Sequence, residues 1–551
     1  MNKKIFFISA LLLCGTISAQ STDNNAVVNV ENEYTPEVIK VNKKGHTPTV
    51  AQDIEMAPLE LEFAYETLPF KEFTSERDVK GIMPRQQKQY PGYARLGYGC
   101  TNDIDAKLAY TLKTSKNGKV GMHAALDGFS TDSKGIDREW DRRMFRTALG
   151  AMYTHKFKSL KIGVTADFSN RVFNYQSTEG YNTGITDKQN SRIYSIKTYG
   201  MSYLKGDFSY SYDAGITYNR RSYSSGMEEG TGELRFMLGG RMEYKVGENM
   251  LENMGIELGY DGFLYNSTLR NTPRHFNNFS SFDVNPYLTF DIEGWNIKVG
   301  TKMNFITANG ARFAIAPDIR LKGNITDAIG VYGEITGGRE ANSLAAIEEF
   351  APYWGFDNVI GAQLLPTYRI VDTKIGSHIT TGPYSFDVYA GYAYTKDDIL
   401  QSIGISSGST MYRLVYSDIA QQNTHDIFIG AGAGCNLGNW MKLSAEVRYD
   451  KWIGDNKDLL MMKPMLTFDI NLEYRIIEDL TLRAGYNLTF YTRGYKRNNS
   501  KNELYARASY QIFDWLGAYI QGDNLLNCDY YEYAGYRALR ARGSLGVTAN
   551  F

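Results

Sequence analysis

Long stretches in which apolar and polar residues alternate are the feature that most limits what this chain can fold into. In "DLTLRAGYNLTFYTR" (479–493), apolar residues from Leu480 to Phe490 alternate with small or polar ones such as Arg483. One face of such a strand suits lipid and the other suits water. Strands of soluble sandwiches usually have about five or six residues, whereas a tilted strand needs about 9–11 to cross a bilayer. The segment is therefore predicted to be a membrane-spanning strand, with Arg483 facing the lumen.

The same alternation recurs along the chain. Further segments that show it are 144–157, 159–175, 233–247, 464–477, 502–513 and 516–527. No apolar run of about 18 residues, the length of a membrane-spanning helix, occurs in the chain. The composition, with 41 tyrosines and 53 glycines but only 13 prolines among 551 residues, also fits a membrane β-barrel, in which only alternate residues face lipid.

The connectors between these segments alternate in length. Short ones are 158–160, 205–207, 293–295, 438–440, 477–479 and 513–515, and longer polar ones are 130–142, 176–190, 224–230, 339–361, 397–409 and 529–537. In outer-membrane barrels the short turns are periplasmic and the long loops extracellular. This parity predicts about 22 antiparallel strands between residues 92 and 551, with the faintest pattern around 92–113 and 409–436.

A sheet in lipid must close on itself, because each unpaired backbone group there costs several kcal/mol. The last segment, "GSLGVTANF" (543–551), is therefore predicted to pair with the first, near 92–100. Leu545 and Val547 would face lipid, and Phe551 would lie at the periplasmic rim. We expect Leu545, Val547 and Phe551 to form the C-terminal signal read by the barrel-assembly machinery. The plainer alternative is that Phe551 is one residue of the aromatic girdle.

The N-terminal part of the chain differs from the rest. Residues 1–19 show two lysines, a short apolar run and small residues up to Ala19, which is typical of a cleaved signal peptide. Residues 20–91 hold six of the 13 prolines and dense mixed charge, so long regular elements are excluded there. We expect an extended periplasmic or lumenal segment at 20–91, followed by the transmembrane barrel at 92–551.

The net charge and the reactive residues argue against several classes of function. The net charge is −1, which excludes the strongly basic balance of a nucleic-acid binder. The six histidines and the cysteines lack metal-ligand spacing, and no glycine-rich loop follows a strand and opens a helix. No metal site, cofactor or catalytic set is predicted, and an enzyme is not expected.

Two connectors carry candidate contact residues. In "DREWDRRMFR" (137–146), the residues that could contact lipopolysaccharide or a ligand at the mouth are Arg138, Trp140, Arg142 and Arg143. The alternative is a solvated loop whose charges neutralise one another.

The longest connector includes "GGREANSLAAIEEFAPYWGFDN" (337–358). Asn342 or Ser343 could cap a short helix over "LAAIEEF", and the aromatic residues after it include Tyr353 and Trp354. This loop could fold over or into the pore, contact a partner lipoprotein, or pack on the barrel rim.

The C-terminal segment resembles the end of TonB-dependent receptors. In that family an "NLLN"-type segment precedes a tyrosine cluster, an arginine and a final strand ending in Phe. The corresponding residues here are Asn524, Leu525, Leu526, Asn527, Tyr530, Tyr531, Tyr533, Arg542 and Phe551. The resemblance implies a receptor-type barrel in a Gram-negative outer membrane. We expect the family's folded plug to be reduced or absent here, because only residues 20–91 stand between the predicted signal peptide and the barrel. Residues 26–38 resemble the short box that engages TonB.

The predicted function is transport of a solute across the outer membrane, with selectivity set by lumen residues such as Arg483 and by the extracellular loops. The alternative is a scaffold barrel that anchors lipoproteins or periplasmic proteins through residues 20–91. The expected partners are outer-membrane lipid and lipopolysaccharide, the barrel-assembly machinery, and TonB or a lipoprotein, with no nucleic acid.

Overall fold

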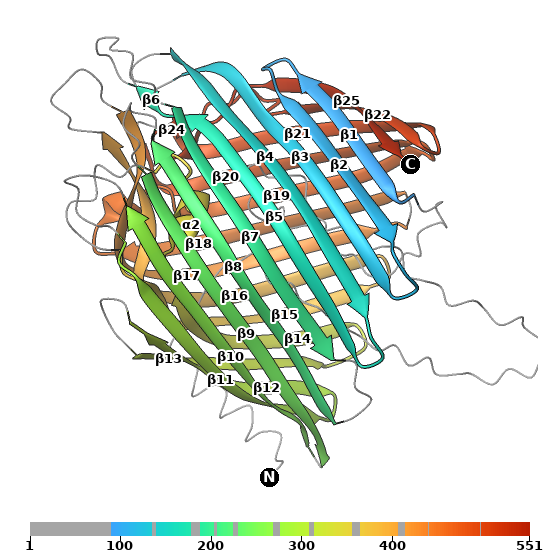
Figure 1. The fold of residues 1–551 in the computed structure, drawn as a ribbon, viewed down its shortest axis with the longest axis vertical. Coiled ribbons are helices and arrows are strands. Elements are labelled where there is room, and N and C mark those ends of the chain that lie inside the picture. Colours follow the sequence, from blue (N-terminus) through green and yellow to red (C-terminus); the bar gives the residue numbers. More distant parts are fainter. Residues whose placement is uncertain are drawn as a thin grey trace, which may run out of the picture.

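The wall of the molecule is a closed barrel of 22 antiparallel strands, seen in a computed structural model (Figure 1). The structure describes residues 90–551 apart from 135–138, 178–187, 203–206, 224–229, 249, 268–275, 308–312, 355–363, 406–413, 439 and 496–497. The predicted signal peptide and almost all of the predicted 20–91 segment lie outside these residues. The predicted strand number and fold class are confirmed, and β1 begins at Gly92.

The 22 wall strands follow one another around the barrel in chain order. The first eleven are β1 Gly92–Gly99, β2 Ile104–Lys113, β3 Gly118–Lys134, β4 Glu139–Lys156, β5 Leu160–Asn174, β7 Lys188–Ser202, β8 Phe208–Tyr223, β9 Gly230–Glu248, β10 Leu251–Ser267, β11 Phe279–Ile292 and β12 Trp295–Ile306. The remaining eleven are β13 Phe313–Asn324, β14 Ile329–Glu340, β15 Thr367–Thr381, β16 Tyr384–Ile405, β17 Leu414–Asn436, β18 Met441–Gly454, β19 Pro464–Ile477, β20 Leu480–Tyr495, β21 Asn498–Phe513, β22 Leu516–Asp523 and β25 Arg542–Asn550.

The smaller elements lie in the long connectors. They are β6 Gln176–Ser177, which pairs with β17, the helix α2 Leu344–Phe350, the 3-10 turn Lys457–Leu460, and the hairpin of β23 Tyr531–Tyr533 with β24 Tyr536–Arg537. No helix among the described residues is both long and apolar enough to cross a membrane.

The barrel closes where β1 pairs with β25, as the sequence predicts. Seven residue pairs join the two strands, from Tyr93 opposite Asn550 to Gly99 opposite Ser544. Next to the Tyr93–Asn550 pair, the backbone N–H of Gly92 donates to the carbonyl of Phe551 at 2.7 Å. The Phe551 ring covers Gly92, where a Cβ atom would collide with it. We call this junction the seam.

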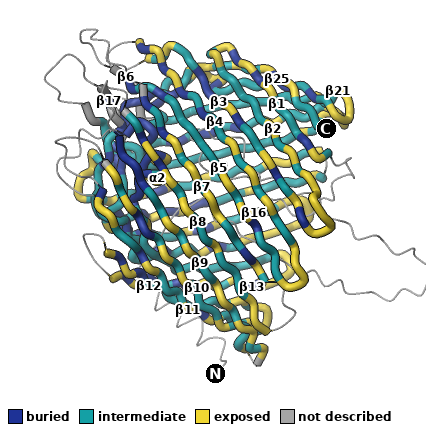
Figure 2. Tube along the Cα trace, in the orientation of Figure 1, coloured by how far each residue is buried: buried dark blue, intermediate teal, exposed yellow. Residues whose placement is uncertain are grey.

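Along the wall strands, most outward-facing side chains are apolar and exposed, and many inward-facing ones are polar. On β25, Leu545 and Val547 lie on the outer face, and Leu545 is 68% exposed. Figure 2 shows exposed and less exposed residues alternating along the wall strands, while buried residues gather around α2 and β17. The deepest burial is therefore confined to one end of the barrel rather than spread through a central core.

The two ends differ in their connectors. At the end that we call the short-turn end, neighbouring strands are joined by few residues, as at Glu293–Gly294 between β11 and β12. Both residues of that turn have positive φ, 51° and 84°, as in the turns that best match strand twist. The opposite end, which we call the mouth, carries the long connectors, including 341–366 and 524–541.

The structure corrects several boundaries expected from the sequence. Residues 130–134 and 139–142, predicted to be loop, extend β3 and β4, and residues 397–405, also predicted to be loop, belong to β16. Both faces of a strand become wet above the lipid, so the apolar alternation ends before the backbone pairing does. Residues 524–527, predicted to continue a strand, leave it after Asp523, and Asn524 adopts positive φ of 45°.

Candidate functional site

Two segments from the long connectors fold into the mouth and pack on the inner wall. We call residues 341–354, which contain α2, the inner segment, and residues 524–541, which contain β23 and β24, the hairpin segment. One buried cluster joins Leu344, Ile347, Ala351 and Trp354 of the inner segment to Ile419 of β17 and to Phe276 in the connector between β10 and β11. A second joins both segments to the wall and to Tyr175, which follows β5. Its members are Tyr353 and Tyr536 with Phe129, Trp140, Met144, Phe173, Tyr175 and Val415.

The inner segment becomes helical because its first turn is capped from two sides. Ser343 is the N-cap, and its hydroxyl accepts a hydrogen bond from the Ala346 N–H at 3.2 Å. The wall residue Glu233 accepts a hydrogen bond from the Leu344 N–H. Both contacts satisfy N–H groups that a helix start leaves unpaired. The predicted cap and short helix are thus confirmed, with Ser343 rather than Asn342 in the capping position.

A buried ion pair fixes α2 to the wall. Arg221 of β8 and Glu348 of α2 lie 3.3 Å apart, and their side chains are 0% and 4% exposed. Arg221 also donates to the Trp354 carbonyl at 2.8 Å, and Ser191 and Asn219 donate to the Glu348 carboxylate. A buried charge pair is tolerated only when hydrogen bonds satisfy its remaining polar atoms. These contacts therefore define one position for the helix.

A second arginine joins the two segments to each other. The Arg142 guanidinium of β4 donates to the Tyr353 hydroxyl of the inner segment at 3.1 Å and to the Glu532 carboxylate of the hairpin segment at 3.1 Å. It also donates to the Arg537 carbonyl. Tyr353 stacks on Tyr536 with ring centroids 3.7 Å apart. Burial raises the pKa of Tyr353, so its hydroxyl stays protonated and accepts from Arg142.

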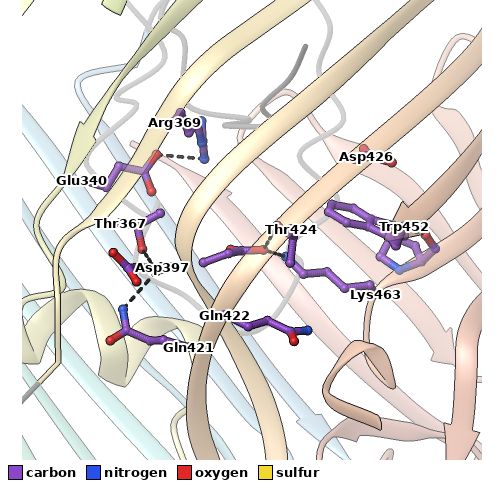
Figure 3. A network of polar contacts seen from close by, with 12 residues as sticks. Glu340, Thr367, Arg369, Asp397, Gln421, Gln422, Thr424, Asp426, Trp452 and Lys463 are labelled. Atoms are coloured by element: carbon purple, nitrogen blue, oxygen red, sulfur yellow. Dashed lines mark hydrogen bonds and ion pairs between the residues drawn. The ribbon is translucent and has the colours of Figure 1, made fainter. Parts of the chain in front are cut away.

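The ends of the long connector are tied together where it leaves the wall (Figure 3). Gln421 donates to the carbonyls of Leu365 at 2.7 Å and Asp397 at 3.0 Å. Thr367 donates to the same Asp397 carbonyl at 2.8 Å and accepts from the Asn342 amide at 3.1 Å. Hydrogen bonds therefore hold both ends of the connector 341–366, at Asn342 and Leu365, to β15, β16 and β17.

Charged and aromatic side chains line the inner face of the wall. Ion pairs on it include Arg483–Glu473 at 3.0 Å, Lys298–Asp318 at 2.6 Å and Arg448–Asp450 at 2.6 Å. Beside the base of the inner segment, Lys463 contacts Asp398 at 2.7 Å and lies over the Trp452 ring (Figure 3). The inner face is therefore compatible with water and polar solutes rather than with lipid.

The predicted contact residues of 137–146 do not share one surface. Trp140 and Arg142 point inward and are buried in the mouth, whereas Arg143 is exposed and paired with Asp141. Arg138 lies outside the described residues. In the inner segment, Tyr353 and Trp354 are 0% exposed, so a ligand would reach them only after the segment moves.

The residues that hold the mouth together were missed by the sequence analysis. They are Arg221, Glu233, Glu348 and Glu532. Arg221 lies in a polar run, "YNRRSY", at the end of a strand, and Glu348 lies in a short helix. Each sequence context is typical of a charged side chain exposed to solvent. The one available signal was the alternation on β8, which places Arg221 on the face opposite the exposed Ile216 and Tyr218.

No group of three or more metal-ligating side chains occurs among the described residues. The ion pairs Arg221–Glu348 and Arg142–Glu532 are intramolecular contacts that join the inner segment and the hairpin segment to the inner wall.

Comparison with known proteins places the fold. No family model matches this chain, and no curated protein sequence does. Among solved structures, the copper transporter OprC matches with a TM-score of 0.61 at 12% identity, over 85% of this chain and 82% of that one.

Two receptors give similar values. A mutant of the ferric enterobactin receptor PfeA from Pseudomonas aeruginosa matches with a TM-score of 0.62 at 10% identity, over 84% of this chain and 81% of that one. The siderophore receptor PirA from Acinetobacter baumannii matches with a TM-score of 0.62 at 10% identity, over 86% and 81%. The chain thus shares its fold with these barrels, and the 22-stranded barrel is the architecture that its C-terminal resemblance to TonB-dependent receptors implied.

Proposed function

We propose that the protein carries a solute across the outer membrane through its lumen, and that the inner and hairpin segments close the mouth between transport events. The observation that carries the proposal is the buried attachment of both segments to the inner wall through Arg221 and Arg142. A barrel that served only as an anchor would gain nothing from an internal closure above a polar lumen.

The direction of the barrel follows from its connectors. The short-turn end faces the periplasm and the mouth faces outside, as in outer-membrane barrels generally. The matched proteins, a copper transporter and two siderophore-type receptors, support uptake as the class of function. We propose that TonB supplies the energy for uptake and that residues 26–38 are the segment that engages it. The proposal assigns no catalytic step to any residue.

Conductance in planar bilayers tests the closure. The full chain is compared with a variant in which residues 343–354 are replaced by a short Gly/Ser linker, and with the control Arg143→Gln on the outer wall. The linker variant should show large, lasting channel openings, while the wild type and the control stay mostly closed. Equal conductance of linker variant and wild type would contradict an occluding role for the inner segment.

A second deletion separates the transport and scaffold functions. Removing residues 20–90 alone, and together with 343–354, shows whether the N-terminal segment also blocks the lumen. If every variant stays silent and the full chain purifies with a stoichiometric lipoprotein or periplasmic partner, the scaffold function replaces transport.

We also propose that Leu545, Val547 and Phe551 are read by the barrel-assembly machinery. Their support is the exposed apolar row on β25 next to the seam. Arg483, on the inner face opposite Glu473, is the lumen residue that we propose contributes to selectivity.

A further inference from the structure

Two arginines face each other on the outer wall. Arg192 of β7 and Arg220 of β8 are directly opposite in the register of the two strands, and both are exposed (Figure 1 shows the two strands side by side). Like charges in directly opposite positions destabilise a sheet. Within the described ranges, neither guanidinium has a carboxylate partner. The pair therefore calls for an anion from outside these residues.

The height of the pair on the barrel indicates where that anion lies. On the outer face of β8, apolar and aromatic side chains extend from Phe208 to Tyr218, and Phe208, Ile216 and Tyr218 are exposed. Ten residues rise about 33 Å along a strand, and at a tilt of about 40° this spans about 25 Å of bilayer, the height of the apolar band. Arg220 is the next outward residue toward the mouth. It therefore lies just above the hydrocarbon, at the headgroups of the leaflet on the mouth side.

The neighbours of the arginine pair form a site that is open to the lipid. Two residues closer to the short-turn end, the rings of Phe168, Tyr194 and Tyr218 form a row across three strands, which we call the ring shelf. Ring centroids are 5.0 Å apart for Phe168 and Tyr194 and 6.4 Å apart for Tyr194 and Tyr218. In the row of the pair, Asn170 is opposite Arg192 on β5, and Gly232 is opposite Arg220 on β9. The Tyr218 hydroxyl lies over Gly232, 3.2 Å from where a Cβ atom would stand, and this row of four residues contains no acidic residue.

We propose that Arg192 and Arg220 together bind a phosphate of a phosphorylated glycolipid in the outer leaflet. A guanidinium presents paired donors that match phosphate oxygens, and two of them on neighbouring strands can hold one phosphate between them. The ring shelf below meets the acyl chains of the same lipid, which free phosphate does not have. Arg143, one of the four residues that the sequence suggested for such a contact, is already paired with Asp141. The inference does not depend on the transport function.

Native mass spectrometry of the purified full chain tests the site. The probe is diphosphorylated lipid A, compared with lipid A from which both phosphates have been removed and with inorganic phosphate as competitor. Relative to wild type, R192Q/R220Q should bind diphosphorylated lipid A at least about tenfold more weakly, because two charge-assisted contacts are lost. The matched control Arg143→Gln should bind as wild type does. Wild type should show the same loss with the dephosphorylated lipid.

Three results would overturn the inference. One is equal affinity of R192Q/R220Q and wild type for diphosphorylated lipid A. Another is displacement of the lipid by inorganic phosphate at similar concentration, which would make the pair a free-anion site. The third concerns R220Q in detergent without lipid, where relief of repulsion should leave the melting temperature unchanged or raised. A clear fall there would show that Arg220 has a structural role instead.

Discussion

The mouth and the short-turn end of this barrel are stabilised in different ways. At the short-turn end, turns such as Glu293–Gly294 join neighbouring strands. Backbone hydrogen bonds between the strands and their apolar outer faces are sufficient to stabilise this end in lipid. At the mouth, two connectors bury aromatic rings and the Arg221–Glu348 ion pair against the wall. One end is thus held by backbone pairing, and the other has a side-chain core like that of a soluble protein.

This difference indicates which part of the molecule is able to move. A barrel wall opens only by breaking ladders of hydrogen bonds in lipid, where each unpaired group costs several kcal/mol. The mouth core is small and rests on a few side-chain contacts, so single substitutions should loosen it while the wall stays closed.

The largest effect is expected from Arg221→Met. The substitution leaves the Glu348 carboxylate buried without its charge partner, which costs about 3–5 kcal/mol. The α2 amides should then exchange hydrogen much faster, while amides of the wall strands exchange as before. Hydrogen exchange with mass spectrometry measures both in one sample.

The double variant R221M/E348L is the matched control. It removes both charges, so exchange in α2 should return toward the wild-type rate. Wild-type exchange in the single variant would refute the view that this pair holds the mouth, and faster exchange throughout the wall would refute the separation of the two ends.

A smaller effect is expected from Tyr353→Phe. The ring still stacks on Tyr536, but the Arg142 guanidinium loses one hydrogen-bond acceptor, at a cost of about 1–3 kcal/mol. Because Arg142 joins both segments, exchange should increase in the hairpin segment as well as in α2. An increase limited to α2 would show that the two segments open independently.

Ser343→Ala should weaken the inner segment alone. Loss of an N-cap typically costs about 1 kcal/mol, and Glu233 still accepts from the Leu344 N–H. Exchange should rise modestly in the first turn of α2, and Ser343→Thr, which keeps the hydroxyl, should restore it. An unchanged rate in the alanine variant would mean that Glu233 is a sufficient cap.

Phe551→Ala tests the opposite end. It removes the Phe551–Tyr110 ring contact beside the seam, and such pairs contribute about 0.5–1.5 kcal/mol beyond their buried area. The melting temperature of the folded barrel should fall slightly, with no change in α2 exchange. If the assembly proposal holds, the yield of folded barrel in cells should fall far more than refolding in detergent. Equal losses would assign Phe551 a girdle role only.

The fold was predictable because its signal is local. Alternation in segments such as 479–493 and the alternating connector lengths set the strand number and the closing pair without any long-range information. The Ser343 cap was predictable for the same reason. The Arg221–Glu348 contact was not, since it joins residues 127 positions apart through a connector whose path no periodicity encodes. Arg142 was taken for a surface residue because its strand continues above the lipid, where both faces look polar.

The seam also bears on how the chain reaches its final form. Joining Tyr93 to Asn550 from an unstructured chain would mean closing a loop of several hundred residues, whose entropy cost grows with the logarithm of its length. If hairpins add one after another along the sequence, the curvature of the growing sheet brings the first edge back to the last. The final step then becomes a short-range encounter. The order of the strands along the chain would then set the order in which they pair. A chain that ended before Arg542 would leave two unpaired strand edges exposed in the bilayer.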